Sequence, residues 1–223
     1  MTRLRVAVLV SGRGSNLQAL LDAAQQPGYP AEIVRVISNV ADVPALQRAE
    51  RAGVPAEVLS HRDFADREAF ERALTDRLEK YETELVCQAG FMRILTPYFV
   101  ERWHNRLVNI HPSLLPAFPG LNTHARALEA GVKLHGCSVH FVRAAVDNGP
   151  IIGQAAVPVL AEDTPERLAA RVLAAEHRLY PYCLRLLAEK RVQVQGERAL
   201  VDAPAGEQAM IISPPPQTPV NSE

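Results

Sequence analysis

Hydrophobic residues in the first half of the chain form short continuous runs, and amphipathic stretches separate these runs. Strands that are apolar throughout, rather than in alternation, are typical of a parallel sheet covered on both faces. Apolar residues at helical spacing between the runs indicate the helices that cover it. The pattern therefore predicts an α/β fold with a mostly parallel, open, twisted sheet and helices on both faces. The expected strands are 5–10, 33–38, 56–59, 85–89 and 107–110, and the expected helices are 17–24, 44–52, 66–80 and 97–103.

The pattern changes after the fifth expected strand. Thr164 and Pro165 form a cap-and-proline pair that predicts the start of a long helix. Pro181 should bend this helix. The C-terminal half is thus expected to combine an antiparallel strand with a long helix. Its other expected elements are a helix at 124–130, strands at 138–142 and 151–159 around a turn at 147–150, and a hairpin of 192–195 and 199–201.

A chain of 223 residues fits one domain with a short extension. We expect the domain to cover residues 1–202. From residue 203 to residue 223 the chain has little periodicity, and five of its 21 residues are proline. This composition predicts a flexible tail.

Composition and charge exclude several classes of protein. The chain is 48% hydrophobic and 22% charged, with a net charge of −1 and no basic tract, so no nucleic-acid surface is expected. No apolar run reaches the roughly 18 residues that span a membrane. The first apolar run stops at Ser11 without a cleavage site, so no signal peptide is expected. The three cysteines, Cys87, Cys137 and Cys183, lie far apart in apolar surroundings, which predicts buried thiols in the cytoplasm.

The stretch from 107 to 120 carries two polar residues at the end of a buried strand. Asn109 and His111 are two apart, so an extended chain points both side chains to one face. Pro112 restrains His111 to an extended conformation. An amide and an imidazole held together suit a reaction in which one atom gains negative charge and another gains a proton. Taken alone, the pair fits local structural hydrogen bonding better than catalysis.

A Gly-rich turn, Ser-Gly-Arg-Gly-Ser-Asn at 11–16, joins the first strand to the first helix. Backbone amides at such a helix start attract phosphate. A dinucleotide site would need a third glycine where the chain has Leu17, and an acid where it has Ser38 and Asn39. A monophosphate therefore fits better than a dinucleotide, and a purely structural turn remains the alternative.

Two carboxylates and one apolar segment complete the candidates. Asp147 lies in a turn, where it could favour a protonated imidazole or bond its own backbone. Glu176 shares the apolar stripe of the long helix and needs a partner, either a structural cation or a ligand amine. The segment 91–95 could pack against a following helix or form a slot for a flat heterocycle. His135 and His140 would lie on opposite faces of a strand, so no metal site is expected.

With these motifs assembled, the chain resembles the phosphoribosylglycinamide formyltransferases, the folate-dependent glycinamide ribonucleotide transformylases of purine synthesis. The resemblance runs from about residue 6 to residue 202. Its motifs are the turn at 11–16, Ala-Gly-Phe-Met-Arg-Ile-Leu at 89–95, Asn-Ile-His-Pro-Ser-Leu-Leu-Pro at 109–116, and His-Gly-Cys-Ser-Val-His-Phe-Val at 135–142, together with Asp147 and Gly149-Pro150. The resemblance implies a formyltransferase-type, Rossmann-like fold.

The resemblance also implies an activity: a formyl group would pass from 10-formyltetrahydrofolate, a cosubstrate, to the amine of glycinamide ribonucleotide, without a metal. Residues 1–105 would bind phosphate, and residues 106–202 would bind folate and carry the catalytic groups. His111, Asn109 and Asp147 would be catalytic. Gly14, Ser15, Asn16 and Glu176 would bind the ribonucleotide. The folate site would be lined by Arg67, Phe91, Met92, Arg93, Ile94, Leu95, Asn109, Arg143, Ala144, Ala145, Val146 and Asp147.

The expected partners are these two small molecules, with no nucleic acid and no membrane, in a monomer or homodimer. Other formyl-folate enzymes stay open as alternatives. A deformylase would pass the formyl group to water and would not need a phosphate loop. A methionyl-tRNA formyltransferase would need a basic surface that the composition does not supply. A non-enzymatic ligand sensor would not need the trio of Asn109, His111 and Asp147.

Overall fold

The computed structural model describes residues 2–202 and residue 213. Seven strands form one sheet in the order β3-β2-β1-β4-β5-β6-β7. The pairs from β3 to β5 are parallel, and β5-β6 and β6-β7 are antiparallel, so the predicted fold class is confirmed. The predicted tail at 203–223 lies outside the described residues apart from Ser213. The strands are β1 (Leu4–Val10), β2 (Ala31–Ser38), β3 (Ala56–Val58), β4 (Leu85–Gln88), β5 (Leu107–His111), β6 (Leu134–Phe141) and β7 (Ile151–Pro158).

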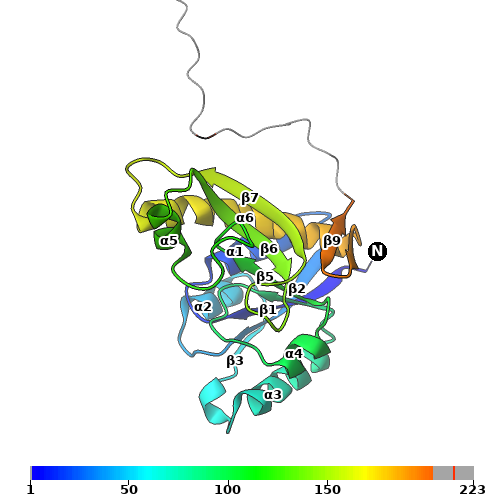
Figure 1. The fold of residues 1–223 in the computed structure, drawn as a ribbon. Coiled ribbons are helices and arrows are strands. Elements are labelled where there is room, and N and C mark those ends of the chain that lie inside the picture. Colours follow the sequence, from blue (N-terminus) through cyan, green and yellow to red (C-terminus); the bar gives the residue numbers. More distant parts are fainter. Residues whose placement is uncertain (1, 203–212, 214–223) are drawn as a thin grey trace, which may run out of the picture.

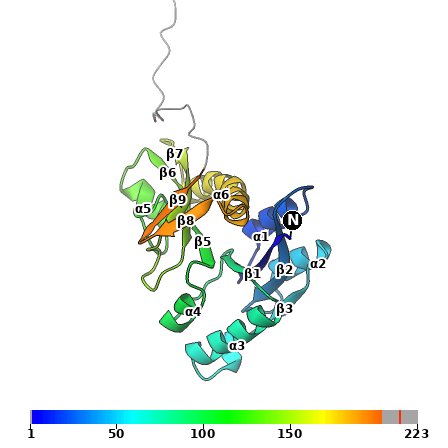
Figure 2. The same cartoon turned by 90° about the vertical axis from the view of Figure 1, so that its right-hand side faces the viewer.

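Helices cover both faces of the sheet, as Figures 1 and 2 show. α1, α2, α5 and α6 contribute to one hydrophobic core, and α3 and α4 contribute to the other. A short 3₁₀ turn, η1 (His61–Asp63), precedes α3, and a separate hairpin of β8 (Val192–Gln195) and β9 (Arg198–Val201) follows α6, as predicted. The helices are α1 (Ser15–Ala24), α2 (Pro44–Arg51), α3 (Arg67–Lys80), α4 (Pro97–Arg102), α5 (Thr123–Glu129) and α6 (Pro165–Ala188).

The continuous apolar runs follow from burial of both sheet faces. In β1, Val6, Val8 and Val10 belong to the core under α1 and α6, whereas Ala7 and Leu9 belong to the core under α3 and α4. All five side chains are fully buried. Successive residues of a strand point to opposite faces, so a strand covered on both faces has no polar positions.

The strand order creates a switch point between β1 and β4. The chain proceeds from β1 to β2 and β3 on one side, and later from β4 to β5 on the other. The connections after β1 and β4 therefore diverge, and they leave a crevice at the carboxyl ends of the two strands. Open α/β sheets bind ligands at such points.

β6 starts earlier than the sequence pattern predicts. Its first four residues, Leu134–Cys137, pair with the last four residues of β7, and this extends the strand from the expected 138 back to 134. Gly136 accounts for the difference. A Cβ on this residue would lie 1.9 Å from the Ala155 carbonyl oxygen, so the two strands can approach this closely only with glycine, which also interrupts the apolar pattern.

α6 is the longest helix, with 24 residues, and it braces the sheet. The Thr164 side chain caps it by accepting from Arg167 N, as predicted. Tyr180 is fully buried, and its hydroxyl donates to the Gln88 carbonyl at the end of β4, 2.9 Å away. The helix thus fixes the end of β4 beside the crevice. Within the described part of the chain, no helix is long and apolar enough to cross a membrane.

Candidate active site

Two cavities open at the carboxyl edge of the sheet. The first, called here the loop cavity, has a volume of about 620 Å³ and lies between the turn at 11–16, residues 89–92, the end of β5 and α6. The second, called here the slot, has a volume of about 140 Å³ and lies between residues 91–95 and residues 143–147. Ile110 and Pro112 line the loop cavity, and Asn109 lines the slot, so the end of β5 separates the two.

The turn at 11–16 has the features of an anion site. Gly14 is the N-cap of α1 in the left-handed conformation, with φ of 71°, and no side chain caps the helix. The first turn holds no acidic residue. The free amides of this turn and the helix dipole both favour a negative group. A Cβ on Gly14 would lie 2.7 Å from the Ala45 Cβ of α2, so glycine is required here on two grounds.

Glu176 faces the same cavity from α6. Its carboxylate accepts a hydrogen bond from Asn16 Nδ2 at 2.7 Å, which joins α6 to the start of α1. Burial raises the pKa of Glu176 above its usual range, and the bond from Asn16 opposes that shift. A single neutral donor leaves acceptor capacity on this carboxylate, so it can receive a further N–H or O–H from a ligand.

The slot has an apolar mouth. Ile94 is 61% exposed and Val146 is 55% exposed, which is unusual for side chains of this size. They stand on opposite walls, with Phe91 and Leu95 buried behind them. Apolar walls with polar groups at the closed end are typical of a site for a flat, partly polar ring.

His111 stands at the end of β5 and is 6% exposed. Its Nε2 lies 3.1 Å from the Phe118 carbonyl oxygen, and its Nδ1 lies 3.4 Å from Asp147 Oδ2. Both ring nitrogens therefore face an oxygen acceptor. A protonated imidazole has both N–H groups satisfied in this arrangement, and a neutral ring has only one. The geometry thus lets either ring nitrogen donate to an oxygen.

His140 joins this cluster from β6. The antiparallel register places it directly opposite Asn109, and Asn109 Nδ2 lies 3.4 Å from His140 Nε2. His140 Nδ1 donates to the Phe141 carbonyl, so Nε2 is the acceptor of a neutral ring. Burial lowers the pKa of His140, which keeps the ring neutral. His140 Nε2 therefore accepts an N–H of the Asn109 side chain, and this contact orients the Asn109 amide group towards the cluster.

Sequence reasoning missed His140, because it treated the residue as a possible metal ligand only. The missing signal was the strand register. His140 lies on the same sheet face as Asn109 and His111, since the alternate residues Val108, Ile110, Val139 and Phe141 all belong to the opposite core. The predicted sharing of a face by Asn109 and His111 agrees with this alternation.

Asp147 closes the cluster. Its Oδ2 accepts from Gly120 N at 2.8 Å, and its Oδ1 lies 3.9 Å from His140 Nε2. Asp147 adopts a left-handed backbone conformation with φ of 50°. Two residues later, a Cβ on Gly149 would lie 1.9 Å from the Phe141 carbonyl oxygen, so the loop can pack this closely only with glycine. The predicted meeting of Asp147 with His111 is thus seen in the structure.

The predicted folate-site residues divide into groups. Phe91, Arg93, Ile94, Leu95, Asn109, Arg143, Ala144, Val146 and Asp147 line the slot. Met92 lines the loop cavity instead. Arg67 is exposed at the start of α3 and, like Ala145, does not line the slot.

The guanidinium of Arg143 has partners that do not line the slot. It pairs with Glu197 at 3.1 Å and donates to Asn105 Oδ1 at 2.9 Å. Glu197 belongs to the turn of the β8-β9 hairpin, so Arg143 joins that hairpin to the slot wall.

No metal site is found within the described residues, since no group of three or more potential ligands comes together there. The first histidine of the motif at 135–142, His135, is buried beside His124, which lines the loop cavity. Its ring contacts Phe118 and His124 edge to face, at 5.7 and 5.5 Å between ring centroids. Burial, with His124 nearby, lowers the pKa of His135 to about 4. It therefore packs as a neutral ring.

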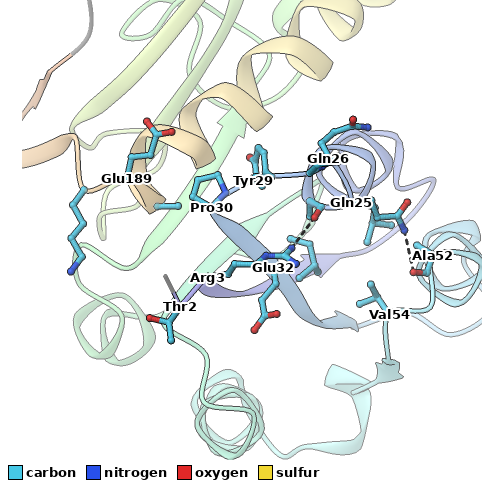
Figure 3. Close-up of a pocket in the computed structure, with 17 residues that line it drawn as sticks. Thr2, Arg3, Gln25, Gln26, Tyr29, Pro30, Glu32, Ala52, Val54 and Glu189 are labelled. Carbon is cyan, nitrogen blue, oxygen red and sulfur yellow. Dashed lines mark hydrogen bonds between the residues drawn. The ribbon is translucent and has the colours of Figure 1, made fainter.

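A larger hollow lies elsewhere. It has a volume of about 1170 Å³ and lies at the amino ends of β1 and β2, beside the end of α6 (Figure 3). Its polar groups serve the fold: Arg3 donates to the carbonyls of Ala24 and Ala31, and Gln25 donates to Ala52. We therefore place the candidate chemistry at the opposite edge, where titratable groups converge.

Comparisons with known proteins show the family of the chain. The chain matches the family model described as formyl transferase over residues 4–184. Phosphoribosylglycinamide formyltransferase of Escherichia coli (strain K12) is 45% identical over 199 residues, which cover 89% of this chain and 94% of that protein. The crystal structure of glycinamide ribonucleotide transformylase 1 from Symbiobacterium toebii has a TM-score of 0.87 and 51% identity, and the match covers 89% of this chain and 94% of that chain.

A third relative is much longer. The trifunctional purine biosynthetic protein adenosine-3 of Bos taurus is 51% identical over 192 residues, which cover 86% of this chain. The chain spans only 19% of that protein's length. The chain thus corresponds to one part of a larger polypeptide in that relative.

Fold, site and comparisons together define the class: the chain is a formyl transferase. Among the formyl transferases, it belongs to the phosphoribosylglycinamide formyltransferases.

Proposed function

We propose that the protein transfers the formyl group of 10-formyltetrahydrofolate to the amine of N1-(5-phospho-D-ribosyl)glycinamide, in the synthesis of purines. The products are formylglycinamide ribonucleotide and tetrahydrofolate. The observation that carries the proposal is the meeting of Asn109, His111 and Asp147 at the wall between two cavities. A donor in one cavity and an acceptor in the other would meet at these groups.

The ribonucleotide fits the loop cavity. Its phosphate would bind the amides of Gly14, Ser15 and Asn16, where the helix dipole favours a negative group. Glu176 would accept hydrogen bonds from the sugar or the glycinamide end. The volume of about 620 Å³ lies within the range of small-molecule sites.

The pterin ring of the folate fits the slot. Ile94 and Val146 would cover its faces, and backbone groups of 143–147 would meet its polar edge. The slot is small, so it would hold the ring, and the remainder of the folate would extend past the exposed mouth. Covering these two side chains would remove apolar surface from water.

The chemistry follows from the cluster. The amine attacks the formyl carbon, a C–N bond forms, and the carbonyl electron pair moves onto oxygen. Asn109 N–H and His111 N–H would stabilise this oxyanion. Asp147 would accept the proton that leaves the amine, directly or through water, and His111 would give its proton to the folate nitrogen as that C–N bond breaks. Proton return from Asp147 to His111 restores the pair.

Magnitudes are consistent with this proposal. A positioned acid or base contributes about 10²–10⁴-fold in rate. One oxyanion donor contributes about 3 kcal/mol. Alignment of two bound reactants can contribute several kcal/mol more. No metal or redox cofactor is required for this chemistry.

One assay tests the proposal. The protein is mixed with 10-formyltetrahydrofolate and glycinamide ribonucleotide, and tetrahydrofolate formation is followed by absorbance. A control omits the ribonucleotide. We expect turnover only when both are present. Formate release without ribonucleotide would instead identify a deformylase, and binding of folate without any turnover would identify a sensor.

We further propose that these two small molecules are the protein's partners, in a monomer or homodimer of one catalytic domain at 1–202. The three cysteines are buried and free, which supports a reducing compartment such as the cytoplasm. Sedimentation equilibrium over a tenfold concentration range decides between monomer and dimer.

A further inference from the structure

Ser11 lies where the loop cavity meets the segment that lines the slot. It directly follows β1 and belongs to the wall of the loop cavity. The β1-β4 ladder ends at Leu9 and Gln88, and the Ala89 N–H still bonds the Leu9 carbonyl. Beyond that point the two chains diverge, and a side chain joins them.

The hydroxyl of Ser11 is engaged on both sides. Its oxygen accepts from Met92 N at 2.8 Å, and its hydrogen is donated to Asn39 Oδ1 at 2.5 Å. Asn39 is buried after β2, and its Nδ2 lies 3.2 Å from His61 Nδ1. Because the Asn39 oxygen takes the hydroxyl hydrogen, the Ser11 lone pairs point to Met92. The serine has a fixed orientation.

Met92 belongs to a segment that serves both cavities. Its own side chain is 69% exposed and lines the loop cavity, and the residues on either side of it line the slot. The far end of this segment is also fixed, because Thr96 N donates to the buried Glu71 carboxylate at 2.9 Å. A displacement at Ser11 therefore acts on a segment that cannot yield at its other end.

We propose that Ser11 is a positioning residue that couples the two substrate sites. Binding of the ribonucleotide phosphate to the turn at 11–16 holds Ser11 in place, and the Ser11–Met92 hydrogen bond holds segment 91–95 in the conformation that takes the pterin. By linkage, folate binding strengthens ribonucleotide binding by the same factor. This inference rests on the proposed function.

The size of the effect is limited by one hydrogen bond. A typical intramolecular hydrogen bond changes an equilibrium by a factor of roughly 2–12. The affinity for a folate analogue that carries no transferable formyl group should thus rise by up to this factor when ribonucleotide is added. We call the affinity for the analogue with ribonucleotide, divided by the affinity without it, the coupling ratio. Ser11→Ala should bring this ratio close to one.

The experiment measures the dissociation constant of that analogue by calorimetry, with and without saturating ribonucleotide, in three variants. Ser11→Thr keeps a hydroxyl and should restore the ratio. Ser38→Ala removes a hydroxyl of the same kind at the end of β2, where it bonds only Val40 among the described residues, and should leave the ratio unchanged. If the substitution only destabilised the fold in general, the ratio would change in both Ser11→Ala and Ser38→Ala.

Each outcome is decisive. A ratio close to one in Ser11→Ala, together with a wild-type ratio in Ser11→Thr, supports the coupling. The proposal is overturned if wild type and Ser11→Ala have the same ratio, or if the ratio in wild type is one. It is also overturned if Ser38→Ala lowers the ratio to one. If wild type binds neither molecule, the proposed function itself fails, and this result is distinct from the others.

Discussion

At the scale of single residues, His111 depends on one carboxylate. Asp147 is the charged neighbour of its Nδ1, and it is itself held by Gly120 N. Asp147→Asn keeps an oxygen for that amide and removes the negative charge. The imidazolium then loses its counterion, so we expect kcat to fall by about 10²–10⁴-fold with nearly unchanged KM values. His111→Ala should lose a similar factor.

Steady-state kinetics on both variants check this prediction, with circular dichroism to confirm that the fold is intact. Turnover within about threefold of wild type, in either variant, would remove that residue from the mechanism.

Glu176 is a residue where the proposed function and stability make opposite demands. Its pKa is raised by burial, so the folded chain binds its proton more tightly than the unfolded chain does. The stability it contributes is present below the ordinary value of 4.5 and is lost as pH rises through the raised pKa. At neutral pH the buried charge is destabilising. Glu176→Gln should therefore be at least as stable as wild type at pH 7, with the difference vanishing towards pH 4.

The same substitution should weaken ribonucleotide binding. A hydrogen bond to a charged group contributes about 1.5–3 kcal/mol, so we expect KM for the ribonucleotide to rise roughly 10–100-fold. Urea unfolding at several pH values and initial-rate kinetics measure the two effects. Destabilisation at pH 7 would argue that Glu176 is mainly a structural partner of Asn16.

His135 should make the protein sensitive to acid. Its pKa is lowered to about 4 from 6.5, because burial beside His124 disfavours the charged ring. A group with a depressed pKa contributes stability above its unfolded value, and that stability is lost as pH falls from 6.5 to 4. The loss amounts to on the order of 3 kcal/mol. His135→Phe should flatten this part of the stability curve.

Chemical unfolding between pH 7 and pH 4 measures the curve. His104, which is exposed after α4, supplies the matched control: His104→Phe should leave the slope unchanged. An equal acid slope in wild type and His135→Phe would show that other groups govern acid sensitivity.

At the scale of elements, the loop from β6 to β7 places Asp147 by close backbone packing. A methyl group on Gly149 would meet the Phe141 carbonyl at 1.9 Å and push the loop outward. A misplacement of about 1 Å can cost 10²-fold in rate, so Gly149→Ala should lower kcat by about that factor.

The control has the same clash in a different place. Gly136→Ala would meet the Ala155 carbonyl, also at 1.9 Å, within the β6-β7 ladder. It should cost stability without a comparable loss of kcat in the folded protein. If Gly149→Ala and Gly136→Ala lose the same factor in kcat when they are equally destabilised, the position of the β6-β7 loop does not set the rate.

Sequence patterns predicted nearly every element, because burial on both sheet faces leaves a clear period and proline marks the helix starts. They failed where tertiary contacts decide. Thr96 precedes α4 at the predicted capping position, but its hydroxyl bonds the Glu71 carboxylate and does not cap the helix. Propensity identifies a capping residue, whereas a buried acid from another helix is invisible to it.

The candidate site was predictable to the extent that its residues are close in sequence. Asn109 and His111 share a face by alternation alone. His140 enters through strand register, which a single sequence does not supply. The commitment of Arg143 to Glu197 depends on a hairpin more than fifty residues away. Long-range pairing thus supplied what local pattern could not.

At the scale of the whole molecule, the described fold is closed by the β8-β9 hairpin. Asp202 N bonds the Arg191 carbonyl at 2.8 Å, and this contact joins the end of β9 to the start of β8. A chain that ends at Asp202 should keep its unfolding free energy within about 0.5 kcal/mol and should keep its turnover. Thermal melting and the formyl-transfer assay test both.

A chain that ends at Gln195 is the control. It loses β9 and the Glu197 partner of Arg143, so it should melt earlier and show a higher KM for folate. If the chain ending at Asp202 loses activity as severely, residues beyond 202 take part in the reaction.

The divergence of the chain between β1 and β4 has a consequence for the design of new catalysts. In the proposed function, the turn at 11–16 and the start of α6 would hold one reactant, and the segments after β4 and β6 would hold the other. Mutagenesis confined to the first set, with Ser11 retained, would alter which amine is modified and leave the delivery of the one-carbon unit intact. In such a catalyst, the segments that bind the amine substrate could be replaced independently of those that bind the formyl donor.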